Sequence, residues 1–197
     1  LDRLSRRRRA LPPPQVLLVA PGLRFAYGDG EQVFDAASVG KVFTATLLMQ
    51  LVERGRLALS DPMVRHLPER EHAGVFVHDG VDHAGRVTLE HLLTHTSGAA
   101  DFFLDRTHGG PRFRDRMLAD LDRFWTPADL IDHTRRFQRP VGRPGRRFRY
   151  SDTGFDLLSR VVEEVGGASL GDQLHERIFG PLDMERALDR APDEHVA

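Results

Sequence analysis

The sequence predicts a mixed α/β (α+β) fold: an antiparallel sheet flanked by helices, with a mainly helical subdomain. Two observations lead to this prediction. Short apolar runs at 15–20 and 23–27 are separated by Pro21-Gly22, which is typical of a β-hairpin. From Ser38 onward, apolar residues recur mostly at helical spacing. Because a two-stranded ribbon is marginally stable alone, we expect the C-terminal part of the sheet to be missing from this chain.

The elements after the hairpin are predicted from apolar spacing and end signals. The clearest helix runs from Ser38 to Gly55, and its apolar residues share one face. The other predicted segments are a loop at 72–86, a short helix from the N-cap Thr88 through His95, an irregular stretch at 109–116, a helix from Thr126-Pro127 to Phe137, a helix over 155–165 stopped by Gly166-Gly167, and a last helix at 169–178. We group the chain as a basic, proline-rich arm (1–14), the strands and first helix (15–55), and a mainly helical subdomain leading to a truncated C-terminus (56–197).

Composition excludes several function classes. The 197 residues carry a formal net charge of −1, which predicts neither nucleic acid nor an anionic membrane as partner. The absence of cysteine excludes disulfides, thiolate metal sites and a cysteine nucleophile. No apolar run approaches the roughly 20 residues of a membrane-spanning helix. The N-terminal residues show no signal peptide and no initiator Met, so we expect a trimmed fragment, and no compartment is assigned. Arg6 to Arg9 fit a mobile arm better than a nucleic-acid site.

Lys41 is the one lysine of a chain in which Lys and Arg together number 28. An arginine cannot lose its proton in a protein, whereas a desolvated lysine can, so position 41 invites the hypothesis of a proton-accepting amine. Ser38 stands three residues earlier, which gives the S-x-x-K pattern of a serine nucleophile with a lysine base. On a helix this spacing puts both side chains on one face. We expect burial at the positive helix end to lower the pKa of Lys41. A chance survival of one lysine in an arginine-rich chain is the alternative.

Tyr150-Ser151-Asp152 is the second motif, and it precedes the helix over 155–165. A tyrosine near a lysine ammonium can act as a general base or proton relay. Taken alone, Tyr150 is better explained as a core tyrosine whose hydroxyl finds one acceptor.

Together these motifs resemble the serine β-lactamase and penicillin-binding protein superfamily, most closely its class C β-lactamase, D-aminopeptidase and esterase branch. The resemblance is carried in order by residues 34–68, 87–103, 143–167 and 178–184. It implies a β-lactamase-like fold, with Ser38 as the acylated nucleophile and Lys41 and Tyr150 as its general-base partners. It also implies that residue 152 helps to hold Lys41 and contacts the substrate amide.

Two departures from the family pattern bear on mechanism. Family members usually carry Asn where this chain has Asp152, and an ionised carboxylate accepts hydrogen bonds but donates none. Asp152 should therefore raise the pKa of Lys41 and move the base role toward Tyr150. The family's third motif, with one oxyanion-hole N–H, lies on a strand far downstream and is absent from this chain. His108-Gly109-Gly110 imitates that motif from a loop, and we interpret it as a bystander.

Other side chains favour structural roles. His91 and His95 have metal-ligand spacing, but Leu92 stands where a zinc protease needs Glu, so we expect no metal. Within the family pattern both histidines pack their helix and the following turn. Trp125 and the phenylalanines at 102 and 103 fit core packing, and the arginines at 146, 147 and 149 fit a solvated loop.

The sequence thus predicts a serine hydrolase that forms a covalent Ser38 ester with a β-lactam, a D-amino-acid peptide or a carboxylic ester. The alternative is a catalytically inactive relative or incomplete fragment that serves as a binding protein. We expect a small-molecule or peptide substrate, no cofactor, no nucleic acid and no membrane span. A second chain or a missing segment would complete the sheet.

Overall fold

The fold is that of a computed structural model, which describes residues 14–30, 32, 34–184 and 187. The chain divides into two units, Leu1–Ala36 and Ala37–Ala197, and each is treated by itself below. The predicted arm at 1–14 lies outside the described residues except for Pro14. Within the described ranges, no helix combines the length and the apolar character needed to cross a bilayer.

The first unit contains the predicted hairpin. Strands β1 (Val16–Ala20) and β2 (Leu23–Tyr27) pair antiparallel, with Val16 opposite Tyr27 and Ala20 opposite Leu23. Gly22 turns the chain between them at a φ of 74°, a left-handed value that glycine adopts without strain. Nearly every side chain of both strands is exposed, including Leu17 and Val19 at 63% and 67%. The hairpin prediction is confirmed, and among the described residues the ribbon pairs with no further strand.

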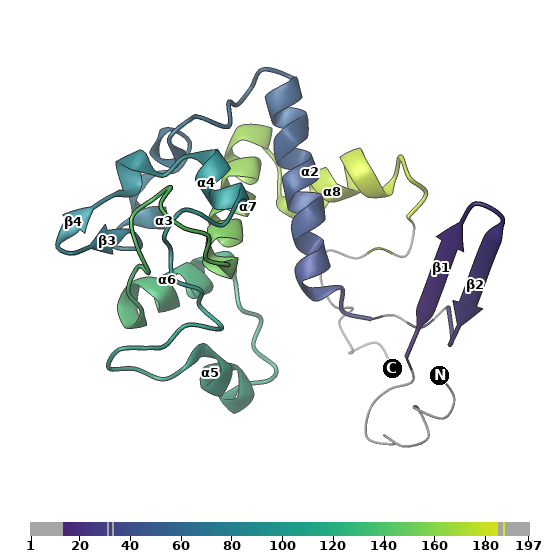
Figure 1. The fold of residues 1–197 in the computed structure, drawn as a ribbon, viewed down its shortest axis with the longest axis horizontal. Coiled ribbons are helices and arrows are strands. Elements are labelled where there is room, and N and C mark those ends of the chain that lie inside the picture. The colour runs from purple at the N-terminus through teal and green to yellow at the C-terminus, as the bar shows by residue number, and fades with distance from the viewer. Residues whose placement is uncertain (1–13, 31, 33, 185–186, 188–197) are drawn as a thin grey trace. The chain divides into compact units, whose positions relative to one another are not determined.

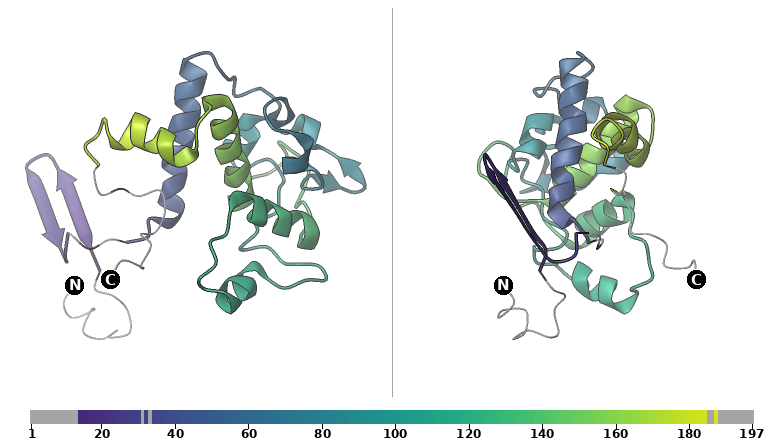
Figure 2. Two further views of the ribbon diagram at one scale, coloured as in Figure 1. Left: turned by 180° about the vertical axis from the view of Figure 1, so that it is seen from behind. Right: turned by 90° about the vertical axis from the view of Figure 1, so that its right-hand side faces the viewer.

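The second unit is built around two helices that run side by side, α2 (Gly40–Glu53) and α7 (Asp152–Gly166) (Figures 1 and 2). Their facing apolar side chains are almost completely buried: Leu47, Leu48 and Leu51 of α2, and Leu157, Leu158, Val161 and Val162 of α7. Burying one leucine-sized side chain stabilises the fold by about 1.5–3 kcal/mol. This seam therefore fixes where the N-terminal ends of both helices lie, and both candidate motifs occupy those ends.

Shorter elements pack around this pair. In chain order they are the 3₁₀ turn η1 (Ala37–Val39), η2 (Met63–Arg65), α3 (Glu69–His72), the two-residue strands β3 (Val77–His78) and β4 (Val81–Asp82), η3 (Ala84–Arg86), α4 (Leu89–Leu93), α5 (Phe113–Ala119), α6 (Pro127–Phe137), α8 (Leu170–Leu174) and the π-helical turn η4 (His175–Phe179). Leu89 and Leu92 of α4, Ile131 of α6, and Ile178 and Phe179 of η4 join the core around α2 and α7.

Several boundaries follow the sequence prediction. Thr88 and Thr126 cap α4 and α6, each through a capping box. In each box the threonine side chain accepts from the backbone N–H three residues later, and the side chain of that later residue accepts from the threonine N–H. Gly167 ends α7 at a φ of 80°, as the Gly166-Gly167 pair predicts.

Other boundaries correct the prediction. The stretch at 109–116 is not irregular throughout, because α5 begins at Phe113, whose ring packs against Phe102 and Trp125. The Thr88 helix stops before His95, which has a φ of 56°. The loop at 72–86 contains the small β3–β4 hairpin. These differences arise from tertiary packing, which local spacing does not encode.

Gly98 is a position at which both the backbone conformation and a backbone neighbour exclude a side chain. Its φ is 83°, and a Cβ there would lie 2.2 Å from the carbonyl oxygen of Gly142. Its own carbonyl accepts a hydrogen bond from the Val141 amide, so the two loops are held close. We expect Gly98→Ala to lower the free energy of unfolding by about 3 kcal/mol or more, through backbone strain plus overlap.

Gly55→Ala is the matched control in the same urea-denaturation experiment. Gly55 has a similar φ of 68° but no atom within 4 Å of the added Cβ. Its cost should be limited to left-handed backbone strain, about 1–2 kcal/mol. Equal losses in the two variants would contradict the close approach of the 98 and 142 loops.

Candidate active site

Ser38 and Lys41 lie where the chain enters α2. Ser38 is exposed in the 3₁₀ turn η1, and Lys41 is the second residue of α2. The Lys41 ammonium donates to Ser38 Oγ at 3.4 Å, so the predicted pair shares one face of the turn. Ala37, immediately before Ser38, has a φ of 44°. A non-glycine residue in this region costs about 1–3 kcal/mol, and such strain is concentrated at functional sites.

Tyr150 reaches the same point from 112 residues further along the chain. Its hydroxyl lies 2.8 Å from Ser38 Oγ, within hydrogen-bonding reach. The same hydroxyl donates to Asp152 Oδ1 at 2.9 Å. The Lys41 ammonium lies 2.5 Å from that Oδ1 atom. All four residues singled out in the sequence, Ser38, Lys41, Tyr150 and Asp152, are therefore brought together in one cyclic set of contacts.

The electrostatics of Lys41 correct one expectation and bear out another. Burial by itself lowers the pKa of Lys41, but hydrogen bonds and charges from Asp152 and Tyr150 outweigh it, so the pKa lies above its ordinary value. The expectation of a lowered pKa is therefore wrong, whereas the expectation that Asp152 would raise it is correct. The physical reason is a sum of contacts: burial is the largest single influence, but the Asp152 carboxylate at 2.5 Å and the Tyr150 hydroxyl together favour the ammonium form more than burial disfavours it.

His95 supports Tyr150 from behind. Its Nδ1 accepts a hydrogen bond from the Ser151 backbone N–H at 3.1 Å, and its ring lies 4.5 Å from the Tyr150 ring, centroid to centroid. Burial, followed by the positive charge of Lys41, lowers the pKa of His95, so the ring stays neutral near pH 7. His95 thus positions the loop segment that carries the tyrosine.

Asp101 is a contributor that sequence reasoning missed. This fully buried carboxylate accepts hydrogen bonds from the backbone N–H groups of Asp152 at 2.7 Å, Leu104 at 2.6 Å and Phe103 at 2.9 Å. It therefore ties the loop at 101–104 to the first turn of α7. Asp101 lies within residues 87–103, one of the segments that carry the family resemblance. Its partner Asp152 is 51 residues away, and no local sequence pattern predicts that contact.

Asp156 is a second acidic group that sequence reasoning missed. It follows Asp152 by one helical turn, and its Oδ2 atom is buried with no hydrogen-bond partner among the described residues. Burial first, and then the charge of Asp152, raises the pKa of Asp156 well above its ordinary range. The site therefore has three carboxyl groups near a single lysine.

The remaining candidates have structural contacts. His91 Nδ1 accepts from the Thr88 backbone N–H within the α4 capping box. The backbone N–H of His108 donates to the Phe137 carbonyl, so the His108-Gly109-Gly110 loop packs at the end of α6. The guanidinium groups of Arg116 and Arg123 each lie over the Trp125 ring. Arg149 is exposed on its loop, as expected, and forms an ion pair with Asp105. The described residues contain no cluster of three or more His, Asp or Glu that could hold a metal ion.

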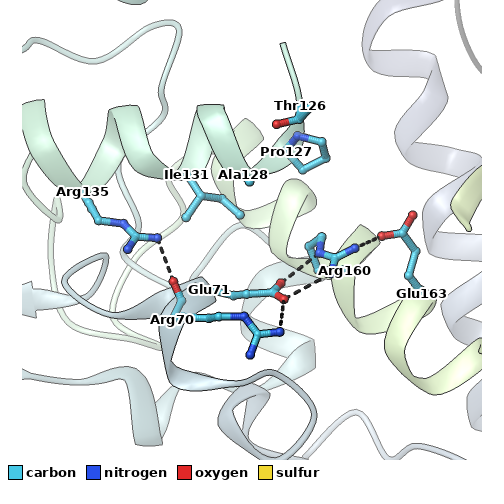
Figure 3. A pocket seen from close by; sticks show the side chains of 9 residues that line it. All are labelled: Arg70, Glu71, Thr126, Pro127, Ala128, Ile131, Arg135, Arg160 and Glu163. Atoms are coloured by element: carbon cyan, nitrogen blue, oxygen red, sulfur yellow. Dashed lines mark hydrogen bonds and ion pairs between the residues drawn. The ribbon is translucent and has the colours of Figure 1, made fainter. Parts of the chain in front are cut away.

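A hollow of about 410 Å³ lies between α3, α6 and α7 (Figure 3). Its lining includes none of the four candidate site residues Ser38, Lys41, Tyr150 and Asp152. Arg160 lines this hollow and forms ion pairs with Glu71, at 2.9 Å, and with Glu163. Arg135 donates to the Arg70 carbonyl across it. The hydroxyl among its lining residues, that of Thr126, bonds to Asp129 in the α6 capping box. We therefore interpret the hollow as an ion-pair network that joins three helices.

Comparison with known proteins places this geometry in a family context. The family model described as Beta-lactamase matches residues 25–194. Penicillin-binding protein 4 of Amycolatopsis lactamdurans is 36% identical over 162 residues, which cover 80% of this chain and 36% of that protein. Esterase EstB of Burkholderia gladioli is 34% identical, with 78% and 38% covered.

Solved structures agree. The D-stereospecific amidohydrolase of a Streptomyces species superposes with a TM-score of 0.69 at 30% identity, over 82% of this chain and 47% of that one. The chain therefore spans less than half the length of each of these three similar proteins.

The lowered pKa of His95 predicts a pH-dependent stability. The unfolded histidine binds a proton at about pH 6.5 and the folded one at lower pH, so the unfolded state gains protons first as pH falls. His72 and His133 are shifted in the same direction, by burial first. The contribution of these three histidines to the free energy of unfolding should therefore be fully present above about pH 6.5 and decline below it, whereas the raised pKa of Asp156 acts in the opposite direction. Urea denaturation from about pH 7.5 to pH 5 measures the sum of these contributions.

His95→Asn isolates the contribution of one histidine. Asparagine tolerates the left-handed φ of 56° and keeps an acceptor for the Ser151 N–H, but it does not titrate. The variant should lose stability less steeply than the wild type as pH falls. An unchanged slope would contradict the assignment of a neutral, half-buried His95.

Proposed function

Because the chain belongs to the Beta-lactamase family, we propose that it is the nucleophile-bearing part of a serine hydrolase that acts through a covalent Ser38 ester. The observation that carries this proposal is the contact of Ser38 Oγ with Tyr150 and Lys41, at 2.8 and 3.4 Å. A nucleophile within hydrogen-bonding reach of a general base, which a third group orients, is the common arrangement for covalent catalysis. Asp152 is the orienting group in this proposal.

The hydrogen bonds of Tyr150 suggest which group accepts the serine proton in this proposal. Tyr150 donates its own proton to Asp152 Oδ1, so its oxygen can accept the proton of Ser38. As Ser38 Oγ bonds to the substrate carbonyl carbon, its proton passes to the Tyr150 oxygen, and the tyrosine proton shifts toward Asp152. Collapse of the tetrahedral species breaks the bond to the leaving group, which takes a proton back from Tyr150. Water then attacks the Ser38 ester by the same route and releases the acid.

In this scheme Lys41 acts as a cation rather than as a base. Its raised pKa keeps the ammonium charged, and its contact with Asp152 offsets the negative charge that the carboxylate brings to the site. The ammonium also faces Ser38 Oγ, where it favours the negative charge that develops during attack.

The substrate classes that we propose are those carried by the family: β-lactams, D-amino-acid peptides or amides, and carboxylic esters. The relatives support this range, since one is named a penicillin-binding protein, one an esterase and one a D-stereospecific amidohydrolase. All share acyl transfer to a nucleophile, for which the contacts of Ser38 are suited.

A labelling experiment tests the proposal. The full-length protein is incubated with a fluorescent penicillin and, separately, with an activated ester, and peptides are analysed for added acyl mass. We expect a covalent adduct on the peptide that contains Ser38, and no adduct in Ser38→Ala. Tyr150→Phe should slow acylation by about 10²–10⁴-fold, because it removes a general acid–base group. A folded full-length protein that is never acylated would instead support the inactive, ligand-binding alternative.

The role of Lys41 is tested by two substitutions at the same position. Lys41→Arg keeps the positive charge, whereas Lys41→Met removes it and keeps a similar length. If Lys41 acts as a cation, the arginine variant should acylate at least about tenfold faster than the methionine variant, as an ion pair of about 1.4 kcal/mol would predict. Equal loss in both variants would return the base role to a neutral Lys41.

A further inference from the structure

We propose that Asp152 selects substrates whose acyl group carries an ammonium substituent close to the reacting carbonyl, which Oδ2 of this carboxylate binds. The inference rests on the proposed acyl transfer at Ser38 and adds to it the chemistry of the acyl group. It starts from an asymmetry in the hydrogen bonding of the Asp152 carboxylate.

One oxygen of that carboxylate is occupied and the other is available. Oδ1 accepts from the Tyr150 hydroxyl and lies 2.5 Å from the Lys41 ammonium. Oδ2 accepts no hydrogen bond from the described residues, and it does not belong to the buried polar atoms. The side chain is 21% exposed. A carboxylate oxygen without a hydrogen-bond donor can accept one from a substrate, whereas an ionised carboxylate cannot itself donate to a substrate carbonyl.

The distances suit a short acyl group. Ser38 Oγ lies 2.8 Å from the Tyr150 oxygen, which lies 2.9 Å from Asp152 Oδ1, so the two ends are at most 5.7 Å apart. An ammonium nitrogen on the α or β carbon of the bound acyl group lies roughly 4–5 Å from Oγ at full extension, at about 1.5 Å per bond. A further charge-assisted hydrogen bond of about 2.8 Å brings it within reach of Oδ2.

The surrounding charge favours a cation over an anion. Among the described residues, Asp152 is the carboxylate that contacts Lys41, and it does so through Oδ1. The buried Asp156 has a raised pKa, which favours its neutral form, so the negative charge that faces the acyl group is that of Asp152. His95 is neutral near pH 7 because burial lowers its pKa. An acyl group with a carboxylate at the same place would meet like charge, and one with a carbonyl would place two acceptors together.

A pair of isosteric esters tests the inference. Glycyl and propionyl esters of one phenol differ by an ammonium in place of a methyl group, and β-alanyl and butyryl esters form a second pair. Values of kcat/KM are measured at about pH 7, below the ordinary α-amino pKa. We expect the cationic-to-neutral ratio to fall about 10–100-fold in Asp152→Asn, because a hydrogen bond to a charged partner is worth about 1.5–3 kcal/mol. Intrinsic ester reactivity cancels in this comparison.

Glu53→Gln is the matched control, since it also converts a carboxylate to an amide. Glu53 is exposed at the far end of α2, about 18 Å along the helix axis from Lys41. Its ratio should equal that of the wild type. A ratio that is the same in wild type and Asp152→Asn, while Ser38-dependent cleavage of the propionyl ester persists, overturns this inference and leaves the proposed function intact.

Wild-type inhibition gives an independent readout if Asp152→Asn cleaves neither ester. Glycinamide should inhibit cleavage of the propionyl ester at a concentration at least about tenfold lower than propanamide does. Equal inhibition overturns the inference. A wild-type protein that cleaves neither ester and is not acylated at Ser38 overturns the proposed function together with the inference.

Discussion

The ion pair between Lys41 and Asp152 is the interaction on which the rest of the site depends. It joins the N-terminal end of α2 to that of α7 across a contact of 2.5 Å. Because each helix carries one of the two sequence motifs, the pair is also what aligns Ser38 with Tyr150. The apolar seam between the helices sets their approach, and the ion pair sets the register of their first turns. A half-buried pair of this kind retains its charges because each ion supplies the other's solvation.

The aspartate at 152 makes this version of the site electrostatically distinct. An asparagine would offer both a donor and an acceptor and would leave the lysine free to shed its proton. The carboxylate instead raises the pKa of Lys41 and accepts the hydroxyl proton of Tyr150 in a hydrogen bond. In the mechanism that we propose, the same side chain shifts proton transfer toward the tyrosine and leaves an oxygen that can bind a donor on the substrate. That proposal couples mechanism and specificity at one residue.

The surrounding scaffold works by holding short segments rather than by enclosing a deep cavity. Asp101 fixes three backbone N–H groups near the start of α7, and His95 accepts from the peptide that follows Tyr150. Gly98 lies between His95 and Asp101 in the sequence, and its lack of a side chain permits the loop at 141–142 to approach this segment. Arg160 lines the hollow between α3, α6 and α7 and forms ion pairs with Glu71 and Glu163 there (Figure 3). These ion pairs link α3 to α7, the helix that begins at Asp152.

The sequence by itself determined the hairpin, the helix after Ser38, the capped starts of α4 and α6, and the candidate site residues, because these depend on local spacing and on motif order. It also anticipated that an aspartate at 152 would raise the pKa of Lys41. The tertiary structure decided what depends on distant partners: the roles of Asp101 and Asp156, the early end of α4, helix α5, and the net direction of the Lys41 pKa. That direction is a balance between burial and an ion pair, and neither quantity exists until α2 and α7 pack against each other.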